Sequence, residues 1–253
     1  MPKVDLFMFQ DFGYPAYVES AKLAEQHAFE NFWLIDSTDA YSDYCAWASL
    51  VAVNTSQLRI GPGVTNPLTR HPRVTANHIL TIHELSKGRA ILGLGAGDNA
   101  VRSMGWKPAT ASVMREAMEV FRRKFKEKKA DIPIYVAVGG PMNTEMAFQK
   151  ADGIIGVGGG GISSGPEGLL NGLERLKLVA RKAGRNFSSI PIRVSVAFAM
   201  SYNKKEALEE IKGPLARMMH GIFVQRRSTF PPNYSVSRQR PKRWERLTTI
   251  STT

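Results

Sequence analysis

Glycine and small polar residues follow five consecutive apolar runs of the chain, a pattern typical of a ligand site. The five loops begin at Asp36, Gly61, Gly95, Gly139 and Gly158. Glycine lets backbone N–H groups approach an anion closely, and the start of a following helix adds its dipole. We therefore expect a ligand that carries phosphate or a flat ring to bind where these loops meet. For the run of four glycines that starts at Gly158 we favour a flexible loop over a specific site.

Asp36 is the most informative single residue because it ends the otherwise apolar run Asn31–Asp36. A carboxylate buried without a partner is costly, so we expect Asp36 to meet a ligand or a basic residue. The alternative is a capping role at a helix that starts near Tyr41. Ser37, Thr38 and Asp39 compete for that role.

The histidines give no metal signal. His71 stands between Arg70 and Pro72, where a hydrogen bond that orders the loop is as reasonable as catalysis. His78 and His83 are five residues apart rather than four, so they do not form a metal pair on one helix face. The sequence also contains no G-x-S-x-G motif and no Walker motif, and its Gly93–Gly97 segment is offset from the dinucleotide fingerprint.

The elements that must position these loops alternate between strands and helices. Seven apolar, largely non-alternating runs predict strands that are buried on both faces, as in parallel sheets. Amphipathic helices are expected between them. The expected strands are Val4–Phe9, Asn31–Asp36, Leu58–Ile60, Arg89–Gly95, Ile132–Val138, Gly153–Val157 and Ile192–Met200.

This alternation favours an α/β fold, and a (β/α)₈ TIM barrel fits best because about 250 residues is its typical length and the chain has 253. An open doubly wound sheet is the alternative. We find no eighth strand after His220. We therefore divide the chain into an incomplete barrel domain, residues 1–221, and a basic tail rich in Ser and Thr, residues 222–253, which we expect to be irregular.

The charge of the chain is uneven. The tail contains seven Lys or Arg against one acidic residue, which supplies half of the net charge of +12. This is weak evidence for a nucleic-acid partner, so we do not expect one.

No apolar run approaches the roughly 20 residues that a membrane span needs. The single Cys45 fits a reducing compartment, and we expect a cytoplasmic protein.

Five segments carry a resemblance to a known family, the bacterial luciferase-like superfamily. They are GPGVTNPLTRHP (Gly61–Pro72), ELSKGRA (Glu84–Ala90), LGLGAGD (Leu92–Asp98), IPIYVAVGGPMNTEMA (Ile132–Ala147) and ADGIIG (Ala151–Gly156). They are most similar to its coenzyme F420-dependent branch, typified by methylenetetrahydromethanopterin reductase. The resemblance implies a (β/α)₈ barrel that binds F420, or alternatively FMN, at its C-terminal face. It also implies a non-prolyl cis peptide bond between Gly63 and Val64.

The resemblance assigns roles to individual residues. Asp36 would contact the deazaflavin and is the one catalytic candidate. Gly63, Val64, Thr65 and Asn66 would back the ring, while Gly97, Asp98, Gly139, Gly140, Met142 and Asn143 would hold the ring substituents and the phosphate. Two positions depart from the family pattern. Ser37 stands where many relatives have histidine, and the stretch Leu6–Phe9 lacks the glutamate that the reductases use.

The expected function is hydride transfer between F420 and a small organic substrate, with methylenetetrahydromethanopterin as one candidate. Two alternatives remain open. One is an FMN-dependent luciferase-like monooxygenase, and the other is a degenerate, non-catalytic homologue that acts as a binding protein. Because an incomplete barrel leaves strand edges unpaired, we also expect a homo-oligomer.

Overall fold

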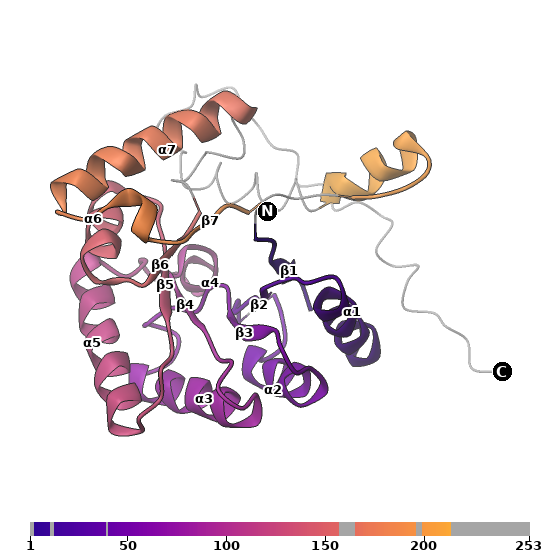
Figure 1. Cartoon of the computed structure of the whole chain (residues 1–253), viewed down its shortest axis with the longest axis horizontal. Helices are drawn as coiled ribbons and strands as arrows, with labels where there is room; N and C mark the ends of the chain where they lie inside the picture. Colours follow the sequence, from indigo (N-terminus) through magenta and orange to yellow (C-terminus); the bar gives the residue numbers. More distant parts are fainter. Residues whose placement is uncertain (1–2, 11–12, 39, 157–164, 196–198, 214–253) are drawn as a thin grey trace.

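The chain folds into a wall of parallel strands surrounded by helices (Figure 1). The computed structural model describes residues 3–10, 13–38, 40–156, 165–195 and 199–213. The strands are β1 (Leu6–Met8), β2 (Asn31–Leu34), β3 (Arg59–Pro62), β4 (Leu92–Leu94), β5 (Ile134–Ala137), β6 (Gly153–Ile155) and β7 (Ile192–Arg193). The helices are α1 (Tyr14–Gln26), α2 (Tyr44–Asn54), α3 (Pro72–Leu85), α4 (Asp98–Ser103), α5 (Ala111–Glu127), α6 (Pro141–Lys150) and α7 (Gly165–Lys182), followed by the short 3₁₀ helix η1 (Phe187–Ser189).

The strands run side by side in chain order. One sheet has the order β1-β2-β3 and the other has the order β4-β5-β6-β7, with parallel pairing throughout. Two parallel bridges, Ile60 to Ala90 and Thr65 to Leu94, join the two sheets. The strand order never reverses, whereas a doubly wound sheet has a reversal at its centre. The doubly wound alternative is therefore wrong.

Side chains alternate between the two faces of the wall. Phe32, Leu34 and Ile60 belong to the large core shared with the helices, which also includes Ile79 of α3. Trp33 alternates with Phe32 and Leu34 and belongs to a second, smaller core with Ile91 and Tyr135, against which Ile155 packs. This separation is typical of a barrel, in which one set of side chains faces the helices and the other fills the interior.

Two glycines let β3 and β4 approach closely. A Cβ atom on Gly61 would clash with the Ile91 carbonyl group, and one on Gly93 would clash with the Pro62 carbonyl oxygen. Gly61, at the start of a predicted loop, and Gly93, within a predicted strand, therefore serve the close approach of the two backbones.

All seven predicted strands are present in the described residues. β3 ends two residues later than expected, and the other six strands are shorter than expected. Helix α2 has the sequence YCAWASLVAVN. It is apolar on nearly all sides, so the sequence shows no amphipathic periodicity there. A further helix covers residues 204–213. The glycine run that starts at Gly158 and the tail, residues 222–253, lie outside the described residues.

Among the described residues, no helix is long and apolar enough to cross a membrane.

Candidate active site at the carboxyl ends of the strands

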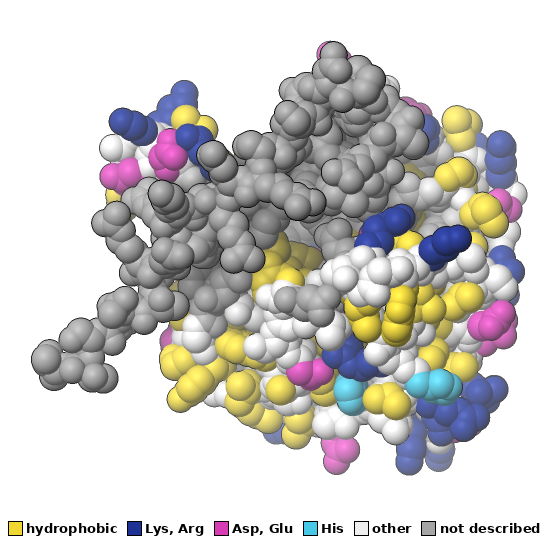
Figure 2. All heavy atoms as spheres, turned by 180° about the vertical axis from the view of Figure 1, so that it is seen from behind, with side chains coloured by type: hydrophobic (Ala, Val, Ile, Leu, Met, Phe, Trp, Pro, Cys, Tyr) yellow, Lys and Arg dark blue, Asp and Glu magenta, His cyan; other side chains and the backbone are white. Residues whose placement is uncertain are grey.

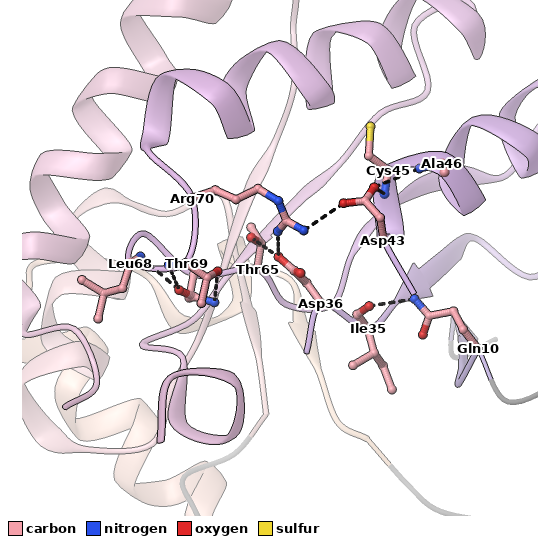
Figure 3. Close-up of polar contacts among 11 residues, drawn as sticks. Gln10, Ile35, Asp36, Asp43, Cys45, Ala46, Thr65, Leu68, Thr69 and Arg70 are labelled. Carbon is pink, nitrogen blue, oxygen red and sulfur yellow. Dashed lines mark hydrogen bonds and ion pairs between the residues drawn. The ribbon is translucent and has the colours of Figure 1, made fainter. Parts of the chain in front are cut away.

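The carboxylate of Asp36 lies just beyond β2 and is almost completely buried, with 6% of the residue exposed. Its Oδ2 atom accepts a hydrogen bond of 2.6 Å from Thr65 Oγ1 and another of 2.6 Å from Arg70 Nη1. Figure 3 shows Thr65 and Arg70 converging on this carboxylate from the loop after β3. The structure thus supplies the basic partner that the buried position of Asp36 required.

Arg70 also reaches a second carboxylate. Its Nη2 atom lies 2.9 Å from Asp43 Oδ2. The other oxygen of Asp43 accepts hydrogen bonds from the backbone N–H groups of Cys45, at 2.9 Å, and Ala46, at 3.2 Å. Asp43 is therefore the N-cap of α2. The alternative that placed this cap among Ser37, Thr38 and Asp39 is wrong, because the helix begins later than expected.

Burial and charge act together on this cluster. Burial alone lowers the pKa of Arg70, but the hydrogen bond and the charge of Asp36 outweigh it and raise that pKa above its ordinary value. Burial, followed by the charge of Asp36, raises the pKa of Tyr44 well above its usual range. The guanidinium carbon of Arg70 lies 5.2 Å from the centre of the Tyr44 ring, within the range of a cation–π contact. Arg70 is thus held as a fixed cation between two loops.

The peptide bond between Gly63 and Val64 is cis, as the resemblance implied. The segment is held on both sides by backbone hydrogen bonds. Gly63 N–H donates to the Leu34 carbonyl group at 2.7 Å, and Thr65 N–H donates to the Gly93 carbonyl group at 3.0 Å. These bonds fix the segment between the ends of β2 and β4.

The Asn66 side chain orders its own loop. Its Oδ1 atom accepts hydrogen bonds from the backbone of Leu68, at 3.0 Å, and Thr69, at 2.9 Å, while Nδ2 donates to Thr69 Oγ1 at 3.0 Å. His71 has a similar role, because its Nδ1 atom accepts from Arg73 N–H at 3.2 Å and caps α3. The loop-ordering interpretation of His71 is confirmed. The role of Asn66 behind a cofactor ring stays a prediction.

Gly97 packs directly against Asn66. It has a φ of 85° and precedes α4, and an added Cβ atom would lie 2.9 Å from Asn66 Cβ. Asp98 follows it at the start of α4 and forms a partly exposed ion pair with Arg102, at 3.3 Å. The structure therefore brings Gly97 into contact with the loop after β3, while the Asp98 carboxylate already has a cation.

The predicted loop after β5 is open. Among the described residues, a Cβ atom on Gly139 or Gly140 would meet nothing within 4 Å. Gly140 precedes α6 without a side-chain cap, and the first turn of the helix contains no acidic residue. Met142 is 70% exposed. The first backbone N–H groups of α6 are thus available to an anion, which is the arrangement expected for a phosphate site.

Four further residues lie at this edge of the strand wall, and the sequence had not led us to predict a role for them in the site. They are Phe7, Gln10, Asp43 and Arg70. Gln10 Nε2 donates to the Ile35 carbonyl group at 2.8 Å, while its buried Oε1 atom has no hydrogen-bond partner among the residues that the structure describes. The ring of Phe7 lies against Gly63 and remains 38% exposed. Only the motif TRHP contained a signal for one of them, Arg70. Within the described ranges, no group of His, Cys, Asp or Glu is arranged to hold a metal ion.

Comparison with known proteins identifies the family. The model of the luciferase-like monooxygenase family matches residues 9–250. The chain belongs to this family. The matched range includes most of residues 222–253, so the division of the chain after Gly221 stays a prediction.

Among curated proteins, the luciferase-like chain is similar to two 5,10-methylenetetrahydromethanopterin reductases. It is 30% identical to that of Methanopyrus kandleri over 79% of the chain and 31% identical to that of Methanolobus tindarius over 74%. The chain covers 66% and 62% of the lengths of these two relatives.

Solved structures agree on the fold. The coenzyme F420-dependent tetrahydromethanopterin reductase of Methanopyrus kandleri superposes with a TM-score of 0.73 at 26% identity, over 85% of this chain and 72% of the reductase. An F420-dependent secondary alcohol dehydrogenase superposes with a TM-score of 0.72 at 19% identity, over 88% and 77% of the two chains, and indicates the fold alone. The predicted luciferase-like (β/α)₈-type fold is confirmed, with seven strands in the described part of the chain.

Proposed function

We propose that this luciferase-like chain is an oxidoreductase that uses coenzyme F420 and transfers a hydride between the deazaflavin and a small organic substrate. The observation that carries the proposal is the convergence of Asp36, Thr65 and Arg70 beside Gly63 at the carboxyl ends of β2 and β3. In parallel barrels these ends are where the active site lies. The names of the relatives, among them F420-dependent reductases and glucose-6-phosphate dehydrogenases, support the choice of cofactor.

The residues present fit a ring and a phosphate. Gly63, Val64, Thr65 and Asn66 would back the ring. Gly139, Gly140, Met142 and Asn143 would hold the phosphate at the uncapped start of α6, with Gly97 and Asp98 beside the ring substituents. The open space at both glycines of the α6 loop supports this assignment. When bound, F420 supplies two-electron hydride chemistry, and the protein supplies binding and orientation.

We assign Asp36 to orientation of the bound ring. Both hydrogen bonds found for its carboxylate within the described residues fall on Oδ2, so Oδ1 is left to accept a hydrogen bond from a ligand. Arg70 and Thr65 keep the carboxylate at one position. The hydrogen-bond acceptor is therefore in place before the ligand binds. This reduces the conformational entropy that is lost on binding.

The reacting substrate would be a small molecule, and methylenetetrahydromethanopterin is one candidate because relatives of that name are the most similar of those described above. We further propose a homo-oligomer in the cytoplasm. Exposed Leu23 of α1 and Leu50 and Val53 of α2 support association. Figure 2 shows hydrophobic side chains gathered at the lower left, over the region of these two helices.

Titration of the purified full chain with F420 and, separately, with FMN tests the proposal. We expect saturable F420 binding at micromolar concentration, measured by the change in F420 fluorescence, and much weaker FMN binding. Gly63→Ala should abolish binding, because its Cβ atom would lie 2.8 Å from Trp33 Cβ. Gly13→Ala is the matched control, because its nearest neighbour would be 3.7 Å away. Preferential FMN binding would favour the monooxygenase alternative, and binding of neither cofactor would favour the non-catalytic one.

A further inference from the structure

Gly63 lies in a slot between two aromatic side chains of the barrel interior. A Cβ atom at this position would lie 2.8 Å from Trp33 Cβ and 2.9 Å from Phe7 Cε2. The backbone of Gly63 therefore rests directly on these residues. Any movement of the Trp33 side chain would be transmitted to the segment that we propose to back the cofactor ring, because packed interiors leave no free space to absorb it.

The orientation of Trp33 is fixed by Asp5. The indole Nε1–H donates to Asp5 Oδ2 at 2.8 Å, and the ring packs edge to face on Tyr135 with the ring centres 5.8 Å apart. Trp33 is 3% exposed. A buried indole N–H group needs an acceptor, and Asp5 provides a charged one. Asn31 Nδ2 donates to the other oxygen of the same carboxylate at 2.8 Å.

The charge of Asp5 is balanced from the opposite edge of the strand wall. Arg193 belongs to β7, and its Nε atom lies 3.1 Å from Asp5 Oδ2. The Nη2 atom of the same guanidinium pairs with Glu30, just before β2. The side chains of Arg193 and Asp5 are only 16% and 12% exposed. One cation of the last described strand thus holds two carboxylates next to the first two strands.

Removal of this cation would leave the Asp5 carboxylate largely buried without a positive partner. A buried charge in that situation moves toward water. This movement changes the acceptor that Asp5 offers to Trp33. The contacts therefore form a chain from Arg193 through Asp5 and Trp33 to Gly63.

We propose that Arg193 and Asp5 are positioning residues that hold Trp33 beneath Gly63 and thereby set the geometry of the ring site. This inference rests on the proposed function in one respect, namely that the bound ring is the deazaflavin of F420. It gives β7 a role in ligand binding through Asp5 and Trp33.

The experiment compares Arg193→Met, Arg193→Lys and Asp5→Asn with the control Arg122→Met in the full chain. Arg122 forms a half-exposed ion pair with Asp152, at 2.7 Å, on the outside of the barrel. The first measurement is the exchange rate of the Trp33 indole proton by ¹⁵N NMR, with the resonance assigned through its loss in Trp33→Phe. The second is the dissociation constant for F420 under conditions where circular dichroism shows each variant folded.

We expect Arg193→Met and Asp5→Asn to speed exchange of the Trp33 indole proton and to raise the F420 dissociation constant about tenfold or more. Arg193→Lys should recover part of both, because an ammonium group cannot span two carboxylates as a guanidinium does. Arg122→Met should change neither. A purely structural brace would lower only the melting temperature, so unchanged indole exchange and F420 binding in folded Arg193→Met would overturn the proposal.

The two proposals fail in different ways. If the unmodified chain binds no F420, the proposed function is wrong, and the indole exchange rate alone decides whether Arg193 controls Trp33. If Arg193→Met does not fold, Arg193→Lys and Asp5→Asn give the same comparison. An unchanged indole proton in Asp5→Asn would then overturn the proposal.

Discussion

Arg70 and Asp36 are separated by 34 residues in the chain, yet their side chains meet at 2.6 Å at the carboxyl end of the strand wall. The pair joins the loop after β2 to the loop after β3. Because Arg70 also holds Asp43, it fixes the start of α2 in the same arrangement. The candidate site is therefore built around an ion pair rather than around an isolated acid.

Substitution of Arg70 should damage both stability and cofactor binding. Arg70→Met removes the cation from a nearly buried carboxylate, and breaking such a pair costs about 3 kcal/mol or more. We expect a lower free energy of unfolding in urea and weaker F420 binding. Lys177→Met removes an exposed pair with Glu174 and should change the stability by less than about 1 kcal/mol. Equal stability of the two variants would contradict the role assigned to Arg70.

Substitution of Gly139 should separate binding from stability. A Cβ atom at this position meets nothing within 4 Å in the described part of the chain, so Gly139→Val should leave the melting temperature nearly unchanged. If the space receives the cofactor phosphate, the valine will block it and raise the dissociation constant for F420 by about tenfold or more. Titration and thermal unfolding of the same samples test this. Full binding by Gly139→Val would show that the phosphate lies elsewhere.

Glu25 should contribute to the pH dependence of stability. Burial raises the pKa of its carboxyl group, but hydrogen bonds from the backbone of Gln57, Ser56 and Leu58 outweigh this effect and place the pKa below its ordinary value of 4.5. Because the folded-state pKa is depressed, the stabilisation is present above the ordinary pKa and is lost as the pH falls through the folded-state value. Urea unfolding between pH 6 and about pH 3 should show a shallower loss for Glu25→Gln than for the unmodified chain.

The single cysteine should be slow to react. Burial, with a further contribution from the charge of Asp43, raises the pKa of the Cys45 thiol to about 11. The thiolate is the reactive form, so alkylation by iodoacetamide near neutral pH should be much slower than for an ordinary thiol. Mass spectrometry over time measures the rate, and the unfolded chain in guanidinium chloride is the control. Equal rates in the folded and unfolded chains would contradict this environment for Cys45.

The sequence by itself determined the alternation of strands and helices, the parallel wall and the edge at which the loops gather. These features follow from short-range patterns. Short apolar runs predict strands buried on both faces, and glycines mark the turns where the strands end. The resemblance added the cis bond between Gly63 and Val64, which the structure confirms.

The local sequence pattern did not predict the bounds of an element that has no hydrophobic periodicity. It also did not predict the partner of a side chain that has several possible partners. Helix α2 is apolar on nearly all sides, so its bounds and its cap at Asp43 were not predicted. Asn66 was expected to back the cofactor ring, and the structure shows that its side chain also orders its own loop, a role that local pattern did not predict.

Only the tertiary structure decided which charges meet. Asp36 required a basic partner, but nothing in the sequence selected Arg70 over the other cations. Arg193 and Glu30 are 163 residues apart, and their contact exists only because the strand wall curves back on itself. The sequence specifies elements through neighbours a few residues away, whereas ion pairs depend on distances through space that are set when the whole wall has assembled.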